Sequence, residues 1–204
     1  MDTNTALWFM LTPAGGLHAF SQSEPTPEQT CLQSLLTGDR ALDLSDWTRA
    51  SPLAAQLHSE ALAKGWIQSL GRPMQGPDAN LDDFLQHVIA ALSGERRAVL
   101  ASGEGFCLGR AGIEQDEADA LSAAAADFGD FSTRQARRGW DGAATGFVSF
   151  HRDAEFLLPS VSFMPFWVDG TGYWLILGGE PLVNNPALVE LFWGLKVAGT
   201  RFQR

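Results

Sequence analysis

The chain has 204 residues, of which 45% are hydrophobic and 19% are charged, a composition typical of a folded globular protein. Its net charge of −10 argues against nucleic acid and anionic membrane surfaces as partners, because both require a basic footprint. The two cysteines, Cys31 and Cys107, are too few for a disulfide framework or a zinc site. Residues 1–16 lack the features of a signal peptide, and no apolar run nears the roughly 20 residues of a membrane span. We therefore expect a cytoplasmic protein.

Residues 1–77 are predicted to form a small α+β region. Residues 6–20 ("ALWFMLTPAGGLHAF") combine apolar stretches with turn residues, which predicts two short strands around a turn at Pro13–Gly16. The stretch 23–29 ("SEPTPEQ") has the proline and acidic residues of a helix start, and Gly38 is expected to end that helix.

A helix–turn–helix–strand order follows, which resembles a winged helix in outline. Leucines at helical spacing predict a helix over 52–64, and residues 66–70 ("WIQSL") are expected to form a strand. DNA recognition needs basic side chains on the second helix, but residues 52–64 carry only Lys64, opposed by Glu60. We therefore expect no nucleic-acid partner.

Two prolines and two glycines in residues 71–80 predict a linker, and a second domain is expected to span 78–204. Apolar residues of 81–92 recur every three or four positions, which predicts an amphipathic helix with Asn80 as its N-cap. The elements expected after it are strands at 96–102 and 105–112, a long alanine-rich helix over 113–138, strands at 146–152, 155–168 and 172–179, and a last helix that starts at Asn185 and Pro186.

The turn at residues 103–105 ("GEG") raises the question of a phosphate-binding loop. The glycine spacing in this stretch matches neither of the common phosphate-binding motifs, and strand residues rather than a helix follow it. Glu104 at the tip would also repel a phosphate. The sequence therefore predicts a β-hairpin here.

Residues 98–128 ("AVLASGEGFCLGRAGIEQDEADALSAAAADF") resemble the roadblock / dynein light chain family. The shared pattern is a small-residue strand, a turn with an acidic residue and glycine, a second strand, and an alanine-rich helix with an acidic start. With the order of elements, the resemblance covers residues from about 80 to 200. It implies an α+β fold, in which a small N-terminal region precedes a roadblock-like sandwich of helix, two strands, helix, three strands and helix.

The resemblance also implies a non-enzymatic regulatory or scaffold protein. Members of this family form homodimers by joining their central sheets and packing their long second helices, and bacterial members act with a Ras-like small GTPase in signalling or motility. No cofactor is implied. Carried over to this sequence, the expected dimer and partner interface comprises Ala120, Ala123, Ala124, Asp127, Phe131, Arg134, Val148 and Phe150.

A small-molecule sensor is the alternative hypothesis. Aromatic residues within 163–177 would line its pocket, although an aromatic core would explain them as well. An enzyme is not expected, because the four histidines are spread singly and no catalytic or metal-binding motif occurs. Cys107, in a strand predicted to be buried, is expected to be an inert thiol. The candidate pocket residues are Phe163, Phe166, Trp167 and Trp174.

Overall fold

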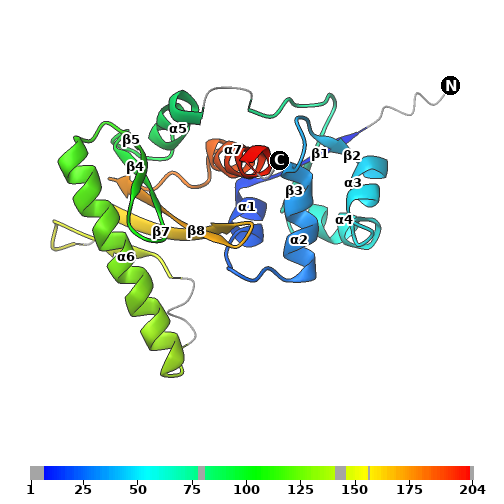
Figure 1. Cartoon of the computed structure of the whole chain (residues 1–204). Coiled ribbons are helices and arrows are strands. Elements are labelled where there is room, and N and C mark those ends of the chain that lie inside the picture. Colours follow the sequence, from blue (N-terminus) through cyan, green and yellow to red (C-terminus); the bar gives the residue numbers. More distant parts are fainter. Residues whose placement is uncertain (1–6, 78–80, 141–145, 156, 203–204) are drawn as a thin grey trace.

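The computed structural model describes residues 7–77, 81–140, 146–155 and 157–202, and it shows two antiparallel sheets with helices packed against them (Figure 1). The fold is α+β, as predicted. The first elements are β1 (Trp8–Leu11), α1 (Pro13–Ala19), α2 (Pro27–Gln33), the 3-10 helix η1 (Ser34–Leu36), β2 (Leu42–Asp43), α3 (Leu44–Ala50), α4 (Ala54–Ala63) and β3 (Ile67–Leu70). The later elements are α5 (Leu81–Ala90), β4 (Ala98–Ser102), β5 (Cys107–Ala111), α6 (Gln115–Arg137), β6 (Val148–Phe150), β7 (Val161–Val168), β8 (Thr171–Gly178) and α7 (Ala187–Phe202).

The small sheet has the strand order β2-β1-β3. Its central strand, β1, pairs antiparallel with β3 from Trp8 opposite Leu70 to Leu11 opposite Ile67. In the chain, β2 and β3 flank the helix pair α3–α4, so the predicted helix–turn–helix–strand order is confirmed. The middle strand of this sheet comes from upstream of that unit.

The second strand predicted within residues 6–20 is wrong, because residues 13–19 form the helix α1. The Thr12 hydroxyl accepts a hydrogen bond from the Gly15 N–H at 3.1 Å, and Pro13 has the fixed φ that suits a first helical position. A side chain at Gly15 would collide with the backbone carbonyl of Trp66. The stretch that was expected to be a turn is therefore a capped helix start packed closely against the segment before β3.

The larger sheet has the strand order β5-β4-β8-β7-β6. The long helix α6 crosses one face of it, and α5 and α7 lie on the other face, where the N-terminal elements also pack (Figure 1). The predicted order of helix, two strands, helix, three strands and helix is confirmed. Asn80, the predicted cap of α5, lies outside the described residues.

The strand predicted over residues 155–168 begins only at Val161. The Leu157 N–H donates to the Asp153 carboxylate at 3.3 Å, and the Ser160 N–H donates to the Phe150 carbonyl at 2.7 Å. The first bond turns the chain locally at Asp153, whereas the second joins Ser160 to the end of β6 just before β7 begins.

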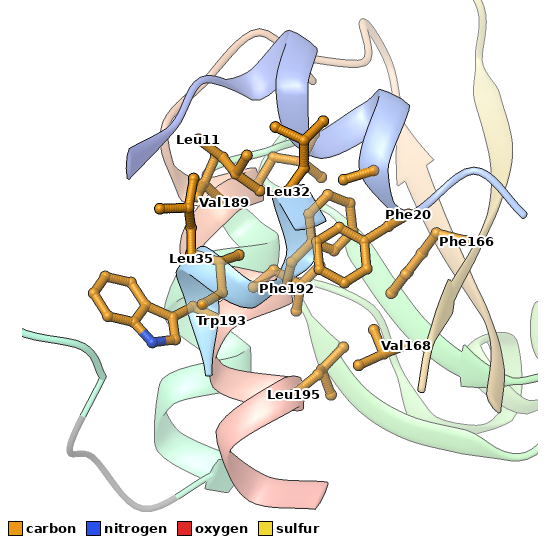
Figure 2. Packing of buried hydrophobic residues seen from close by; sticks show 14 of the residues in the cluster. Leu11, Phe20, Leu32, Leu35, Phe166, Val168, Val189, Phe192, Trp193 and Leu195 are labelled. Carbon is orange, nitrogen blue, oxygen red and sulfur yellow. The ribbon is translucent and has the colours of Figure 1, made fainter. Parts of the chain in front are cut away.

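Buried apolar residues form one cluster on each face of the larger sheet. In the larger cluster, the Phe192 ring stacks on Phe20 with 4.5 Å between centroids and lies 5.1 Å from Phe166 (Figure 2). Because Phe20 belongs to the N-terminal elements and Phe166 to β7, the two parts of the chain share this core. Four apolar residues of α7 at helical spacing are buried in this core: Leu188, Leu191, Phe192 and Leu195.

The glycine-rich stretch after β4 is a hairpin, as predicted, and its tip packs against α6. Gly105 has a φ of 90°, which L side chains rarely adopt. A Cβ at Gly105 would stand 3.0 Å from the Ala126 Cβ and 3.1 Å from the Ser122 carbonyl oxygen. The absence of a side chain at Gly105 therefore lets the hairpin pack closely against α6.

Candidate functional site

The strand β6 is an edge of the larger sheet. It pairs with β7 on one side, from Val148 opposite Phe163 to Phe150 opposite Val161, and no strand among the described residues covers its other side. An edge strand leaves backbone N–H and C=O groups free on that side, and these groups are a template for pairing with another chain.

Large apolar side chains are exposed around this edge and along the C-terminal half of α6. The ring of Phe128 in α6 lies 4.9 Å from the buried ring of Phe163 and 5.8 Å from Phe150, so the exposed aromatic residues continue outward from the core. Phe150 itself is 47% exposed. We use the name β6 apolar surface for the set Phe131, Trp140, Phe147, Phe150, Leu157 and Leu158, all of which are exposed.

The residues expected at the interface lie on this side of the molecule or along α6. The members on α6 recur every three or four positions and therefore follow one stripe of the helix. Ala124 and Val148 are half-buried. The exposed members are Ala120, Ala123, Asp127, Phe131, Arg134 and Phe150.

The four aromatic residues of the alternative pocket are not brought together. Phe163 and Phe166 are buried in different clusters, on opposite faces of the larger sheet. The alternation of side chains along β7 explains this, because residues an odd number apart point to opposite faces. Trp167 and Trp174 do lie together, on the α6 face, where both line a groove.

This groove has a volume of about 830 Å³. We call it the α6 groove, and its walls are the C-terminal half of α6 from Ala126 to Arg137, the β7–β8 hairpin from Pro165 to Trp174, and the segment Ser21–Glu24. The walls therefore come from the N-terminal elements as well as from the larger sheet. Carboxylates of Glu24 and Asp130 and the guanidinium of Arg137 belong to side chains that line it.

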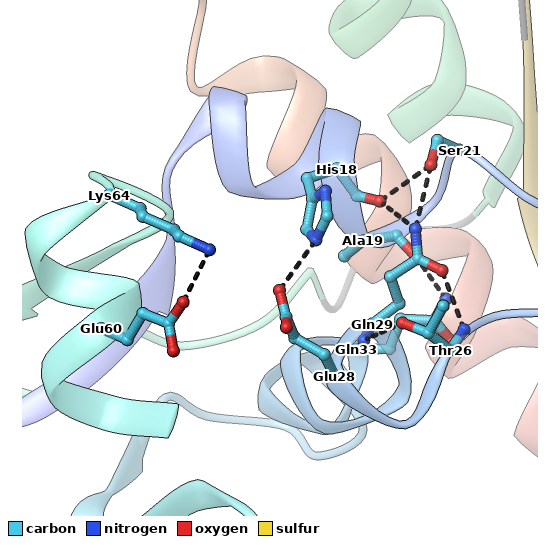
Figure 3. A network of polar contacts seen from close by, with 9 residues as sticks. All are labelled: His18, Ala19, Ser21, Thr26, Glu28, Gln29, Gln33, Glu60 and Lys64. Atoms are coloured by element: carbon cyan, nitrogen blue, oxygen red, sulfur yellow. Dashed lines mark hydrogen bonds and ion pairs between the residues drawn. The ribbon is translucent and has the colours of Figure 1, made fainter. Parts of the chain in front are cut away.

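Two buried glutamines of α2 hold the chain that leads into the segment Ser21–Glu24 (Figure 3). The Gln29 amide donates to the His18 carbonyl at 2.9 Å and to the Ser21 hydroxyl at 3.1 Å, and the Gln33 amide donates to the Ala19 carbonyl at 2.7 Å. On the other side, the backbone N–H of Trp167 donates to the Phe20 carbonyl at 3.0 Å. These bonds therefore anchor this wall of the α6 groove at its start, at Ser21.

Two ionisable groups near the hairpin tips have shifted pKa values. Burial, reinforced by the charge of Asp119, raises the pKa of the Cys107 thiol, which favours the unreactive neutral form. Cys107 is nevertheless half-buried in an edge strand, so the expectation of a buried strand is wrong. Burial also raises the pKa of Tyr173, and the carboxylates of Asp169 and Glu104 raise it further.

The basic side chains of α3 and α4 are engaged within the molecule. Arg49 contacts Asp46 at 2.6 Å, and Lys64 contacts Glu60 at 2.7 Å while it also lies over the Trp66 ring. Within the described residues, no group of three His, Cys, Asp or Glu side chains could hold a metal ion. No helix in the described part of the chain is long and apolar enough to span a membrane.

Sequence reasoning missed the segment Ser21–Glu24 as a wall of the α6 groove, and no local pattern identifies it. Two glycines in the sequence did indicate a close approach at this groove. Gly172 stands opposite Trp167 in the β7–β8 pairing, and Gly129 interrupts a helix at a cost of about 1 kcal/mol relative to alanine. Such glycines indicate a close approach, and here they lie against the indoles of Trp167 and Trp174.

The sequence matches no family model and none of the curated proteins. Among solved structures, the chain is similar to the crystal structure of a Roadblock/LC7 domain from Streptomyces avermitilis, with 19% sequence identity and a TM-score of 0.38. The likeness covers 61% of this chain and 98% of that one.

Proposed function

We propose that the chain is a non-enzymatic regulatory module that pairs with a second copy of itself through β6 and α6. The observation that carries this proposal is the β6 apolar surface beside an open strand edge. Large exposed apolar side chains beside an open strand edge are typical of an interaction site. Pairing of two β6 edges would satisfy their free backbone groups and remove Phe150 and Phe147 from water.

The small residues of α6 support the same arrangement. Antiparallel pairing of two β6 strands would bring the two α6 helices near each other, on one face of the joined sheet. Ala120 and Ala123 are exposed on α6, and small side chains let two helices approach closely. Phe131, further along the same stripe, would then pack across the pair.

The partner that we propose for the pair is a Ras-like small GTPase. The class of partner comes from the family resemblance of residues 80–200. The charge of the chain agrees with it in one respect, because a protein with a net charge of −10 attracts partners that present a basic face. In this proposal the module acts by binding and supplies no catalytic group.

The mass of the protein in solution tests the pairing. We expect light scattering after gel filtration to give twice the mass of one chain at micromolar concentrations. Phe150→Asp should give single chains that remain folded, because a carboxylate at the edge opposes its own copy. The matched control is Phe106→Asp at the opposite edge of the sheet, which is 69% exposed and should leave the pair intact. A single-chain mass for the parent protein would contradict the proposal.

Nucleotide-dependent binding tests the partner. The purified protein is used to capture proteins from lysate of the source organism, loaded in parallel with GDP or a non-hydrolysable GTP analogue. We expect a small GTPase to be enriched in one nucleotide state, and the enriched state identifies the form that the module recognises. Capture that is indifferent to nucleotide would contradict a GTPase partner and leave the pairing proposal standing.

A further inference from the structure

Two tryptophans of the α6 groove have indole N–H groups without an acceptor. The fully buried tryptophans differ: Trp47 donates to the Cys31 carbonyl at 3.0 Å, and Trp193 donates to the Gly38 carbonyl at 2.7 Å. For Trp167 and Trp174, no acceptor occurs within the described part of the chain. Trp174 is only 6% exposed, yet its indole nitrogen is not fully buried, so this donor can be reached from outside.

The positions of these indole nitrogens point to the groove. The Trp174 nitrogen lies 3.8 Å from where a Cβ on Gly129 would stand, and the Trp167 nitrogen lies 3.3 Å from where a Cβ on Gly172 would stand. Both glycines line the α6 groove. The absence of side chains at these two positions leaves the donors accessible from the groove, so a bound molecule with acceptor atoms can reach them.

The charged groups of the groove are also unpaired. Glu24, Asp130 and Arg137 form no ion pair with other described residues, and all three side chains are exposed. At the adjoining hairpin tips, Glu104 adds negative charge, whereas the carboxylate of Asp169 is paired with Lys196 at 2.5 Å. The groove therefore favours a ligand that carries a positive group, and an indole face beside a carboxylate suits such a group through a cation–π contact.

The length of the groove limits the shape of that ligand. From Ala126 to Arg137 the helix rises by eleven steps, which is about 16 Å. A peptide in the polyproline II conformation rises about 3.1 Å per residue, so about five residues span this distance. Glu24 on one wall and Asp130 and Arg137 on another are exposed, so the groove is open to solvent. An extended chain suits an open groove better than a compact metabolite, which is normally buried on most sides.

We propose that the α6 groove binds an extended, proline-rich peptide segment that contains an Arg or Lys. A polyproline II backbone has no internal hydrogen bonds, so its carbonyl groups are free to accept from the indoles of Trp167 and Trp174. Proline rings pack on the indole faces, and the basic side chain lies against Glu24 and Asp130. The anchoring of the Ser21–Glu24 wall at Ser21 lowers the ordering cost of binding. This site is separate from β6, and it does not depend on the pairing proposed above.

The indole signals in an ¹⁵N-labelled sample test this proposal directly. The probes are synthetic capped peptides with a proline-rich framework and a single Arg placed at each position in turn. We expect at least one probe to shift the Trp167 and Trp174 indole N–H signals saturably, while the signals of Trp47 and Trp193 stay in place because their donors are already bonded. Replacing Arg by Glu in that probe should weaken binding.

Three variants complete the test. Trp167→Phe keeps an aromatic ring but removes the donor, and it should weaken the best probe about fivefold, the usual effect of one hydrogen bond. Asp130→Asn should reduce the preference for Arg over Glu. The matched control, Trp8→Phe, removes a half-buried indole of β1 that lies outside both the groove and the β6 apolar surface and should leave binding unchanged.

Three results would overturn the proposal. The first is that no probe shifts the two indole signals at millimolar concentration. The second is that Trp167→Phe binds the best probe as tightly as the parent protein. The third is that Trp167→Phe changes the mass in solution, since the groove would then be covered by a second copy of the chain rather than by a peptide.

Discussion

The two faces of the larger sheet are covered to different extents. On one face, α5, α7 and the N-terminal elements together bury a large cluster that includes Phe192 and Trp193. On the other face, α6 alone covers a smaller cluster. A single helix is about 10–12 Å wide with its side chains, whereas five strands at about 4.8 Å spacing span about 19 Å.

This difference explains where the candidate sites lie. One helix cannot cover the whole face, so apolar and aromatic residues remain accessible on both flanks of α6. The β6 apolar surface occupies one region, and the α6 groove, with Trp167 and Trp174, occupies another. In our proposals, the well-covered face provides stability, and the face under α6 provides surfaces for binding. Each prediction below tests this division of roles.

The largest expected effect is at Phe192, on the well-covered face. Phe192→Ala should lower the free energy of unfolding by about 3–5 kcal/mol, the usual cost of removing a buried phenylalanine ring. Because the ring contacts both Phe20 and Phe166, we expect a single urea transition, followed by fluorescence and circular dichroism, to shift as a whole. Two transitions, of which only one moves, would show instead that residues 1–77 and 78–204 unfold separately.

A smaller effect is expected at Phe128, on the face under α6. Phe128→Asp should lower the free energy of unfolding by about 2–4 kcal/mol, since its ring contacts Phe163 but is only half-buried. Leu121→Arg should act in the same way. Asp127→Ala, at an exposed neighbouring position, is the control and should change stability by less than about 0.5 kcal/mol. If Phe128→Asp stays fully stable and merely loses its second copy, the assignment of the inward face of α6 is wrong.

The sequence predicted the larger sheet better than the details of the N-terminal region. Long periodic patterns, such as that of α6, and the Gly-Glu-Gly turn are local signals that no distant contact overrides. The prediction of a strand within Pro13–Ala19 was wrong, because Gly15 makes room for the backbone of Trp66, which lies far away in the chain. The strand predicted over residues 155–168 was too long at its start, because β6 ends at Phe150 and pairs with β7 only as far as Val161.

The candidate sites show the same limit. An exposed Phe131 or Phe150 could be proposed from the family resemblance, because both lie in elements that were predicted correctly. The α6 groove could not be predicted from the sequence, because its walls come from separate segments of the chain. The position of its Ser21–Glu24 wall also depends on the buried amides of Gln29 and Gln33. Phe163 and Phe166 were grouped with Trp167 by sequence proximity, but the alternation of β7 sends Phe166 to the opposite face.

The smallest expected effect is at Tyr173, where the two faces meet at the end of the β7–β8 hairpin. Its ring stacks on Phe166 on the well-covered face, yet the residue also lines the α6 groove. It is the single tyrosine of the chain, so the ultraviolet absorbance of tyrosinate reports it alone. We expect a titration midpoint above the ordinary value of about 10, because burial, then Asp169, then Glu104 raise its pKa.

The sign of the linked stability change follows from that direction. The folded state holds the phenolic proton more tightly than the unfolded chain, so this contribution to stability is fully present below about pH 10 and is lost as the pH rises through the folded-state pKa. Tyr173→Phe should remove that part of the alkaline loss. Glu104→Gln should lower the midpoint by less than burial raises it, and Glu114→Gln, which does not act on Tyr173, should leave it unchanged. A midpoint at or below the ordinary tyrosine value would mean that the phenol is open to water, and the hairpin end would then belong to the accessible face alone.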